Sequence, residues 1–459
     1  MTTLPLGNLV RTSPFWVYFR SSRLLKAALV FNVAYYVAVV LLFLFHLGTG
    51  GIESTILMLD FQVFYAAGQM IRVSPADLYT VSPNGLPYRY FPLFGMIMSL
   101  FVSFPVEVLY ILDISLMMVC NCGTVYMAFH VCLTYGVSVE TKNFEKSLTV
   151  LSIAPPHIVN LVLGQISQLV VLMALVVLFL LRTMKTDRLL PHFWVGLLVG
   201  LVSSMKPFML LLVPFLIPLS HPVRSTLRRQ LVPLAGTTAG LSTALAPSVL
   251  FFLMWPTSVT DFLEVNFVHY LDGHHSTSIT SLVIHLLPQL AEAYPRFLLS
   301  LALGVLIFAK SFSRFIMTPA GEKDYLSHFS DMMFLVLLVY SDSWFLFLAI
   351  WYSFLAPSML LLYQRCVFLS DATKRLDLLW SGANNLLAFF SIGVVLHYLI
   401  LGFDPVIPVW LTILYLLYQS LLKTKRNAAS VESCAPPGSS SNSGPLTEVY
   451  SSVDCERLS

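Results

Sequence analysis

Apolar runs close to twenty residues long recur along the whole chain, and they constrain the fold more than any other feature. Crossing the roughly 30 Å hydrocarbon core of a bilayer takes about 20 helical residues, because lipid offers no hydrogen-bond partner to an open backbone. Only 11% of the 459 residues are charged, whereas soluble domains carry roughly 25%. The sequence therefore predicts an all-α bundle of transmembrane helices.

Seven runs have the length and composition of membrane spans, and four further pieces are harder to divide. The seven cover residues 25–45, 106–129, 231–255, 297–317, 345–363, 378–401 and 406–422, and the four cover 91–104, 148–163, 166–181 and 193–219. Together they predict about 12 crossings.

Basic residues set the expected orientation, because loops rich in Lys and Arg stay in the cytoplasm. Arg11, Arg20, Arg23 and Lys26 precede the first span with no acid among them, whereas residues 231–295 contain neither Lys nor Arg. We therefore expect both termini to be cytoplasmic. The loops at 47–90 and 256–280 are then extracytoplasmic.

The number of crossings between Asp60, expected outside, and Arg182, expected inside, must be odd. Four apolar pieces occupy that interval, so one of them does not span. We expect it to be the Pro155-Pro156 segment, which would dip into the bilayer and return near Gly164 and Gln165.

Composition divides the chain into three parts. Residues 1–24 form a cytoplasmic amino-terminal segment, residues 25–422 the transmembrane domain, and residues 423–459 a cytoplasmic tail. The tail is expected to be disordered, because its Pro- and Ser-rich stretch at 436–444 cannot bury enough apolar surface to fold. The six cysteines show no zinc or disulfide spacing and the net charge is only +3, so we expect no cofactor and no nucleic-acid partner.

Asp60 is the first candidate for chemistry, and it lies in the segment M-L-D-F-Q-V-F-Y-A-A-G. Aromatic residues recur there at helical spacing, which predicts a short amphipathic helix in the outer interface. Asp60 is then either an ordinary N-cap or first-turn acid, or a general base whose pKa is raised in a partly dry cleft.

Two tyrosines, an arginine and an amide follow on the same expected face. Tyr79 precedes the motif P-Y-R-Y-F-P-L-F, which contains Arg89 and Tyr90 and is typical of either an interfacial aromatic belt or the lining of a site. Gln165 follows Gly164 in L-G-Q-I-S-Q. Glycine there permits close backbone approach, and the amide can donate to a sugar hydroxyl.

Lys206, in S-S-M-K-P-F, lies at the outer turn of a hairpin expected over residues 193–219. A cation amid apolar residues either snorkels to the surface or meets an anion. In the acidic loop that follows, His274 and His275 precede Ser276. Paired histidines are typical zinc ligands, but no Glu-x-x-His and no second cluster accompany them, so no metal site is predicted.

Taken in order, these motifs resemble the polytopic mannosyltransferases of glycosyltransferase family 87, in the GT-C superfamily. The resemblance covers roughly residues 60 to 290 and fades toward the carboxyl end; it includes D-F-Q-V-F-Y-A-A, L-Y, Y-R-Y-F-P-L-F, L-G-Q-I-S-Q-L and M-K-P-F-M-L-L-L-V-P. The catalytic subunit of GPI mannosyltransferase I is also similar in its first loop. It usually shows Asp-x-Asp, however, where this chain has Met58-Leu59-Asp60.

The resemblance implies a GT-C-like fold and a hexosyltransferase whose donor is a polyprenyl- or dolichyl-phosphate hexose, mannose above all. Its expected partners are membrane lipids, this donor and a glycolipid or lipid-linked glycan acceptor. The implied roles are catalytic base for Asp60, phosphate binding for Lys206, Arg89, His274 and His275, and sugar or acceptor binding for Tyr79, Tyr90, Gln165 and Ser276.

Two positions depart from the family pattern. His274-His275-Ser276 stands where family members often show an Asn or Gln before Ser, and Ser343-Trp344 lacks the His that often follows such a pair. The phosphate or acceptor contacts are therefore expected to differ from those of the family.

Two other classes of protein stay open. One is a transporter or flippase of lipid or small solute, which favours charges near the bilayer midplane and matched broken helices. The other is a catalytically silent membrane subunit or chaperone. The Ser-rich tail favours the endoplasmic reticulum membrane, and a prokaryotic plasma membrane stays open.

Overall fold

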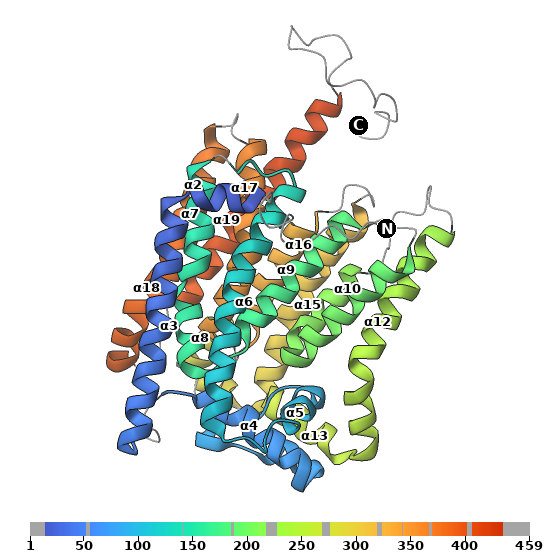
Figure 1. The fold of residues 1–459 in the computed structure, drawn as a ribbon. Coiled ribbons are helices and arrows are strands. Elements are labelled where there is room, and N and C mark those ends of the chain that lie inside the picture. The colour runs from blue at the N-terminus through green and yellow to red at the C-terminus, as the bar shows by residue number, and fades with distance from the viewer. Residues whose placement is uncertain are drawn as a thin grey trace, which may run out of the picture.

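The computed structural model describes residues 14–51, 56–139, 141–184, 188–216, 227–268, 276–318, 324–341, 343–366, 370–401 and 406–434. Within these ranges the regular elements are helices, and the only β-type pairing is an isolated antiparallel bridge between Ser276 and Trp344. The all-α prediction is therefore confirmed. Helices α4 (Leu59–Val73), α5 (Pro92–Ser99) and α13 (Thr257–Leu263) gather at one end of the bundle (Figure 1), which we call the α4 end.

Six segments of the described chain are long and apolar enough to cross a bilayer. They lie in α3 (Arg23–Thr49), α6 (Val106–Thr134), α7 with α8 (Lys142–Ile153 and Pro155–Leu163), α12 (Leu227–Met254), α15 (Ala293–Met317) and α19 (Val406–Cys434). Further helices are α9 (Ser167–Thr183), α10 (Leu189–Met205), α16 (Tyr325–Val339), α17 (Leu348–Cys366) and α18 (Ser370–Leu401). Short elements are α2 (Pro14–Ser21), η2 (Pro75–Thr80), η3 (Pro83–Gly85), η4 (Pro207–Leu212), α11 (Val213–Leu216), η5 (Glu264–Val268), α14 (Ile279–Leu286), η7 (Pro288–Ala291) and η9 (Phe345–Phe347).

Apolar side chains cover the outside of the bundle as well as its inside. On α3, Val30, Leu41 and Phe45 are exposed, and on α15 Val305 and Leu306 are exposed. A protein in water avoids extended apolar faces of this kind. The surface and the helix lengths are those of a multi-pass membrane protein; the count of about 12 crossings and the cytoplasmic termini stay predictions.

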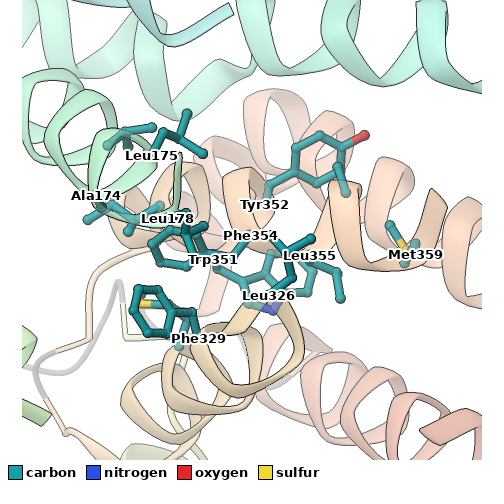
Figure 2. Packing of buried hydrophobic residues seen from close by; sticks show 14 of the residues in the cluster. Ala174, Leu175, Leu178, Leu326, Phe329, Trp351, Tyr352, Phe354, Leu355 and Met359 are labelled. Carbon is teal, nitrogen blue, oxygen red and sulfur yellow. The ribbon is translucent and has the colours of Figure 1, made fainter. Parts of the chain in front are cut away.

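The apolar core lies where α9, α16 and α17 meet. Figure 2 shows Leu178 of α9 beside Phe329 of α16 and Trp351 of α17, and all three side chains are fully buried. Helix α16 is buried at every position from Leu326 to Val339. The sequence analysis did not predict this helix as a span, although it forms the centre of the bundle.

The structure gives helix lengths that bear on which segment fails to cross, although the choice itself stays a prediction. Residues Lys142–Leu163 form a single apolar segment of sufficient length, while α5 has eight residues and rises only about 12 Å. The Pro155-Pro156 piece therefore has the length to span, and the piece at 91–104 contains the helix that is too short. The two prolines occupy the first turn of α8, where proline begins a helix rather than ending one.

The structure moves the predicted start of the disordered tail, residue 423, further along the chain. Helix α19 continues to Cys434, well beyond residue 422. The remaining residues of the predicted tail, 435–459, lie outside the described part of the chain.

Helices α10 and α12 approach each other closely through glycines spaced four residues apart. A Cβ added to Gly196 would collide with the Thr237 carbonyl oxygen, and one added to Gly240 with that of Phe193. Small residues at this spacing let two membrane helices pack backbone against backbone. The pair fixes the position of α10, which ends at Met205, directly before Lys206.

Gly240→Val is expected to destabilise the protein by at least about 2 kcal/mol, because the added side chain forces the two backbones apart. The measurement is the thermal unfolding midpoint in detergent. Gly304→Val on α15 is the matched control, since the Cβ that it adds would have Val339 Cγ1 as its nearest neighbour, at an ordinary 3.7 Å. Equal midpoints for the two variants would contradict this account of the helix pair.

Candidate active site

A cleft lies at the α4 end, and residues distant in the chain line it. Its polar lining includes Asp60, Arg89, Tyr90, Gln165 and Lys206. These side chains come from α4, from the segment before α5, from the turn between α8 and α9, and from the junction of α10 with η4. The structure thus brings together five of the residues that the sequence singled out.

Asp60 belongs to the first turn of α4 and is not the N-cap. The N-cap is Met58, which has a left-handed backbone (φ 53°) and makes no side-chain capping bond. Its backbone N–H instead donates to the Val162 carbonyl at 3.0 Å, which fastens the start of α4 to the end of α8. Asp60 is only 9% exposed, and its Oδ2 atom accepts no hydrogen bond from the described residues.

Gln165 reaches the cleft through a tight left-handed turn. Gly164 has φ +72°, and the Gln165 backbone N–H donates to the Asn160 carbonyl at 2.8 Å. A Cβ at Gly164 would lie 2.6 Å from the Cβ of Phe61 and 3.1 Å from the Tyr110 ring. Glycine is therefore required twice, for the backbone angle and for the close approach of this turn to α4.

Gly164→Ala is expected to push the turn away from Phe61 and so separate Gln165 from Asp60. We expect the activity of the site to fall at least about tenfold, since about 1 Å of misplacement can lower a rate by about a hundredfold. The measurement is kcat/KM beside the unfolding midpoint. Gly136→Ala is a control, because Gly136 also has a positive φ (+78°) but has open space around it. If the two variants lose activity equally, the close approach at Gly164 is not what matters.

Lys206 is held inside the cleft and does not snorkel to the surface. It is 5% exposed and lies between the end of α10 and Pro207, the first residue of η4. Its Nζ donates to Gln165 Oε1 at 3.1 Å and to Tyr90 Oη at 3.4 Å. The Tyr90 and Phe347 ring centroids lie 5.1 and 5.0 Å from Nζ, where aromatic faces attract a cation.

Gln165 connects the groups of the site through both ends of its amide. While Oε1 accepts from Lys206, Nε2 donates to Tyr90 Oη at 3.2 Å. The segment carrying Tyr90 is in turn tied to α10, since Phe91 N–H donates to the Ser204 carbonyl at 3.1 Å. Tyr90, Gln165 and Lys206 therefore form one hydrogen-bonded group with little freedom to rearrange.

Burial shifts both charged groups of the site away from their charged forms. Desolvation raises the pKa of Asp60, and Gln165 and Lys206 partly oppose that shift. In the turn between α10 and η4, desolvation lowers the pKa of Lys206 to about 8, and Asp60 acts in the opposite direction. A base of raised pKa and a cation in one cleft are typical of a reactive site.

Asp60 and Lys206 line the same cleft without forming an ion pair, as judged over the described residues. A buried ammonium that meets only an amide oxygen, a phenol and aromatic rings is costly until an anion joins it. The site is therefore suited to bind a ligand that carries negative charge near Lys206 and leaves Asp60 available.

Tyr79 and Ser276, two predicted ligand-binding residues, are not among the residues that line the cleft. Tyr79 is buried behind it, where its hydroxyl donates to the Tyr90 carbonyl at 3.0 Å and its ring packs on Phe262. Ser276 is buried too, with its Oγ 3.1 Å from Ser278 Oγ. Both residues contact residues of the lining from outside it, Tyr79 at Tyr90 and Ser276 at Trp344, and their roles in ligand binding stay predictions.

The predicted phosphate ligands His274 and His275 lie outside the described residues. Within the described chain, no group of three His, Cys, Asp or Glu residues has the proximity needed to hold a metal ion.

A second wall of the cleft is formed by residues that were not among the predicted site residues. It consists of residues that enter from other elements: Phe208, Asn266, Tyr340, Trp344, Leu346 and Phe347. Aromatic residues are abundant in this chain, which has 34 Phe, 20 Tyr and 7 Trp, so their occurrence alone carries no signal. The sequence signal nearest to this wall was the polar run Ser341-Asp342-Ser343 before Trp344, between two apolar stretches.

No protein-family model matches the chain, and no curated protein matches it.

Proposed function

We propose that the protein is an integral-membrane hexosyltransferase. It transfers a hexose, with mannose as the favoured sugar, from a polyprenyl- or dolichyl-phosphate donor to a lipid-linked or glycan acceptor. The configuration at the anomeric carbon is inverted. The observation that carries the proposal is the buried Lys206 ammonium beside an unpaired Asp60 carboxylate oxygen in one cleft among membrane-spanning helices. The motif resemblance to glycosyltransferase family 87 points to the same reaction.

In the proposed step, the acceptor hydroxyl oxygen forms a bond to the anomeric carbon as the bond from that carbon to the phosphate oxygen breaks. The hydroxyl proton passes to Asp60. The electron pair of the broken bond stays on the polyprenyl phosphate, which gains one negative charge. Lys206, with Arg89, stabilises that added charge, so the interaction is stronger in the transition state than in the ground state.

The lining of the cleft fits a lipid-borne donor. Apolar residues such as Val63, Phe208 and Leu346 line it together with the charged groups, which suits a ligand with an isoprenoid chain and an anionic head. A transporter would need charges along a path through the bilayer. Here Asp60, Arg89 and Lys206 all line one cleft at the α4 end.

The test uses the purified protein in lipid nanodiscs, supplied with radiolabelled mannosyl farnesyl phosphate and lipid-linked glycans extracted from its own membrane. The expected result is label in a new lipid or glycan product whose anomeric configuration is opposite to that of the donor. Donor left intact, together with passage of labelled lipid or solute across proteoliposomes, would instead establish a transporter.

A further inference from the structure

Hydroxyl groups fasten one wall of the cleft in place. Thr277, Thr280, Ser281 and Ser343 are each 0% exposed, and we call them the hydroxyl clasp. Thr280 Oγ1 donates to the Val339 carbonyl at 2.8 Å, and Ser281 Oγ donates to that of Ser341 at 2.7 Å. The segment after the outer loop is thereby joined to the turn that follows α16.

The clasp fixes the backbone on both sides of Trp344. Thr277 N–H donates to the Ser343 carbonyl at 2.8 Å, and the Thr277 and Ser343 hydroxyls lie 2.9 Å apart. Ser276 pairs with Trp344 in the antiparallel bridge, and Phe347 N–H donates to the Trp344 carbonyl at 2.9 Å. So many bonds around one residue hold it in a set position before any ligand binds.

Trp344 lines the cleft together with Asp60 and Lys206, and unlike the clasp it keeps part of its surface open. A hexose ring has an apolar face of C–H groups and a rim of hydroxyls. An indole offers a flat, electron-rich face that complements such C–H groups and loses little conformational freedom on binding. The polar groups of the cleft, including Asn266 and Tyr340, then face the hydroxyl rim.

We infer that Trp344 is the platform on which the hexose ring of the donor stacks, held in place by the hydroxyl clasp. The inference rests on the proposed function and deepens it by assigning the sugar-binding surface. With the phosphate at Lys206 and the ring on Trp344, the anomeric carbon lies between these two residues and is open to an acceptor deprotonated by Asp60. Trp344 thus contacts the sugar ring, and Lys206 binds the phosphate.

The test measures Kd for two defined ligands, mannosyl farnesyl phosphate and farnesyl phosphate, by titration calorimetry on full-length protein in nanodiscs. Trp344→Leu is expected to weaken the mannosyl ligand about tenfold, or about 1.4 kcal/mol, and to leave farnesyl phosphate within about twofold. Trp344→Phe keeps a smaller ring and is expected to weaken the mannosyl ligand only about threefold. Trp194→Leu, a half-exposed tryptophan outside the cleft lining, is the matched control.

The outcomes separate this inference from the proposed function. If Trp344→Leu and Trp344→Phe weaken both ligands equally, Trp344 contacts the isoprenoid chain and the inference is overturned, while the proposed function stands. An unchanged preference for the mannosyl ligand in both variants overturns it as well. If the parent binds neither ligand, both the inference and the proposed function fail. Should Trp344→Leu not fold, the Trp344→Phe ratio alone decides, with a loss of about threefold expected for the smaller ring.

Discussion

Asp60→Asn is expected to lower kcat/KM for hexose transfer by roughly 10²- to 10⁴-fold, the range that a positioned general base contributes. The amide keeps the shape of the carboxylate but cannot accept the proton of the acceptor hydroxyl. Because the carboxylate does not pair with Lys206, donor binding is expected to stay within about threefold of the parent. The measurements are initial rates with labelled donor and a separate donor Kd.

Asp77→Asn provides the matched control, since Asp77 is an exposed acid in η2 whose partner is Ser74. It is expected to transfer at the rate of the parent. Asp60→Asn retaining more than a tenth of the parent rate, with normal donor binding, would rule Asp60 out as the base.

The pH profile of kcat/KM follows from the direction of the Asp60 shift. The active form is the carboxylate, and burial raises its pKa above the ordinary value of an aspartate. Activity is therefore lost as pH falls through this raised pKa, at a higher pH than an exposed aspartate would give.

Lys206→Ala is expected to lower kcat by roughly 10²- to 10³-fold, because it removes a preorganised positive charge from the place where phosphate charge develops. Lys206→Arg keeps a cation and is expected to recover part of that loss. Lys374→Ala, which removes an exposed lysine of α18, is the control. Equal kcat values for Lys206→Ala and the parent would exclude Lys206 from the transition state.

Lys206 also predicts the alkaline limit of activity. Its active form is the ammonium, whose pKa burial lowers to about 8, so kcat/KM falls as pH rises through about 8. An arginine side chain stays protonated beyond pH 12, so Lys206→Arg is expected to abolish the loss of kcat/KM at alkaline pH and to keep the loss at acid pH. An alkaline loss of kcat/KM that persists unchanged in Lys206→Arg would show that another group titrates there.

The candidate site was predictable from sequence where a residue was chemically out of place. Lys206 lies within an apolar run, and Gly164-Gln165 separates two apolar pieces. A polar residue in such a position is costly in a membrane helix, so each one indicates a functional role. Tyr79 and Tyr90 were predicted on the same grounds, as tyrosines of one polar segment. Only the three-dimensional arrangement shows that Tyr90 lines the cleft and that Tyr79 lies behind it.

The wall containing Trp344 was not predictable, because its position depends on hydroxyl contacts between segments about sixty residues apart. Thr277 and Ser343, for example, look like ordinary small polar residues in the sequence. Sequence alone does not reveal which hydroxyls meet.

Helix α16 was missed for a similar reason. Asp331 lies near its middle, and a charge there argues against a buried helix. In the structure Asp331 pairs with Arg314, and its Oδ1 accepts from Gln419 Nε2 at 2.8 Å. The two partners come from α15 and α19 and stabilise the carboxylate. The sequence of α16 alone does not show these partners, and it therefore does not reveal that the helix is buried.

The most direct measurement of the central claim is a cryo-EM structure in nanodiscs with a nonhydrolysable phosphonate analogue of mannosyl farnesyl phosphate. The claim predicts the phosphonate within hydrogen-bond distance of Lys206 Nζ, with the anomeric carbon accessible from the side of Asp60. Analogue density elsewhere on the bundle, with the cleft between Asp60 and Lys206 empty, would contradict it.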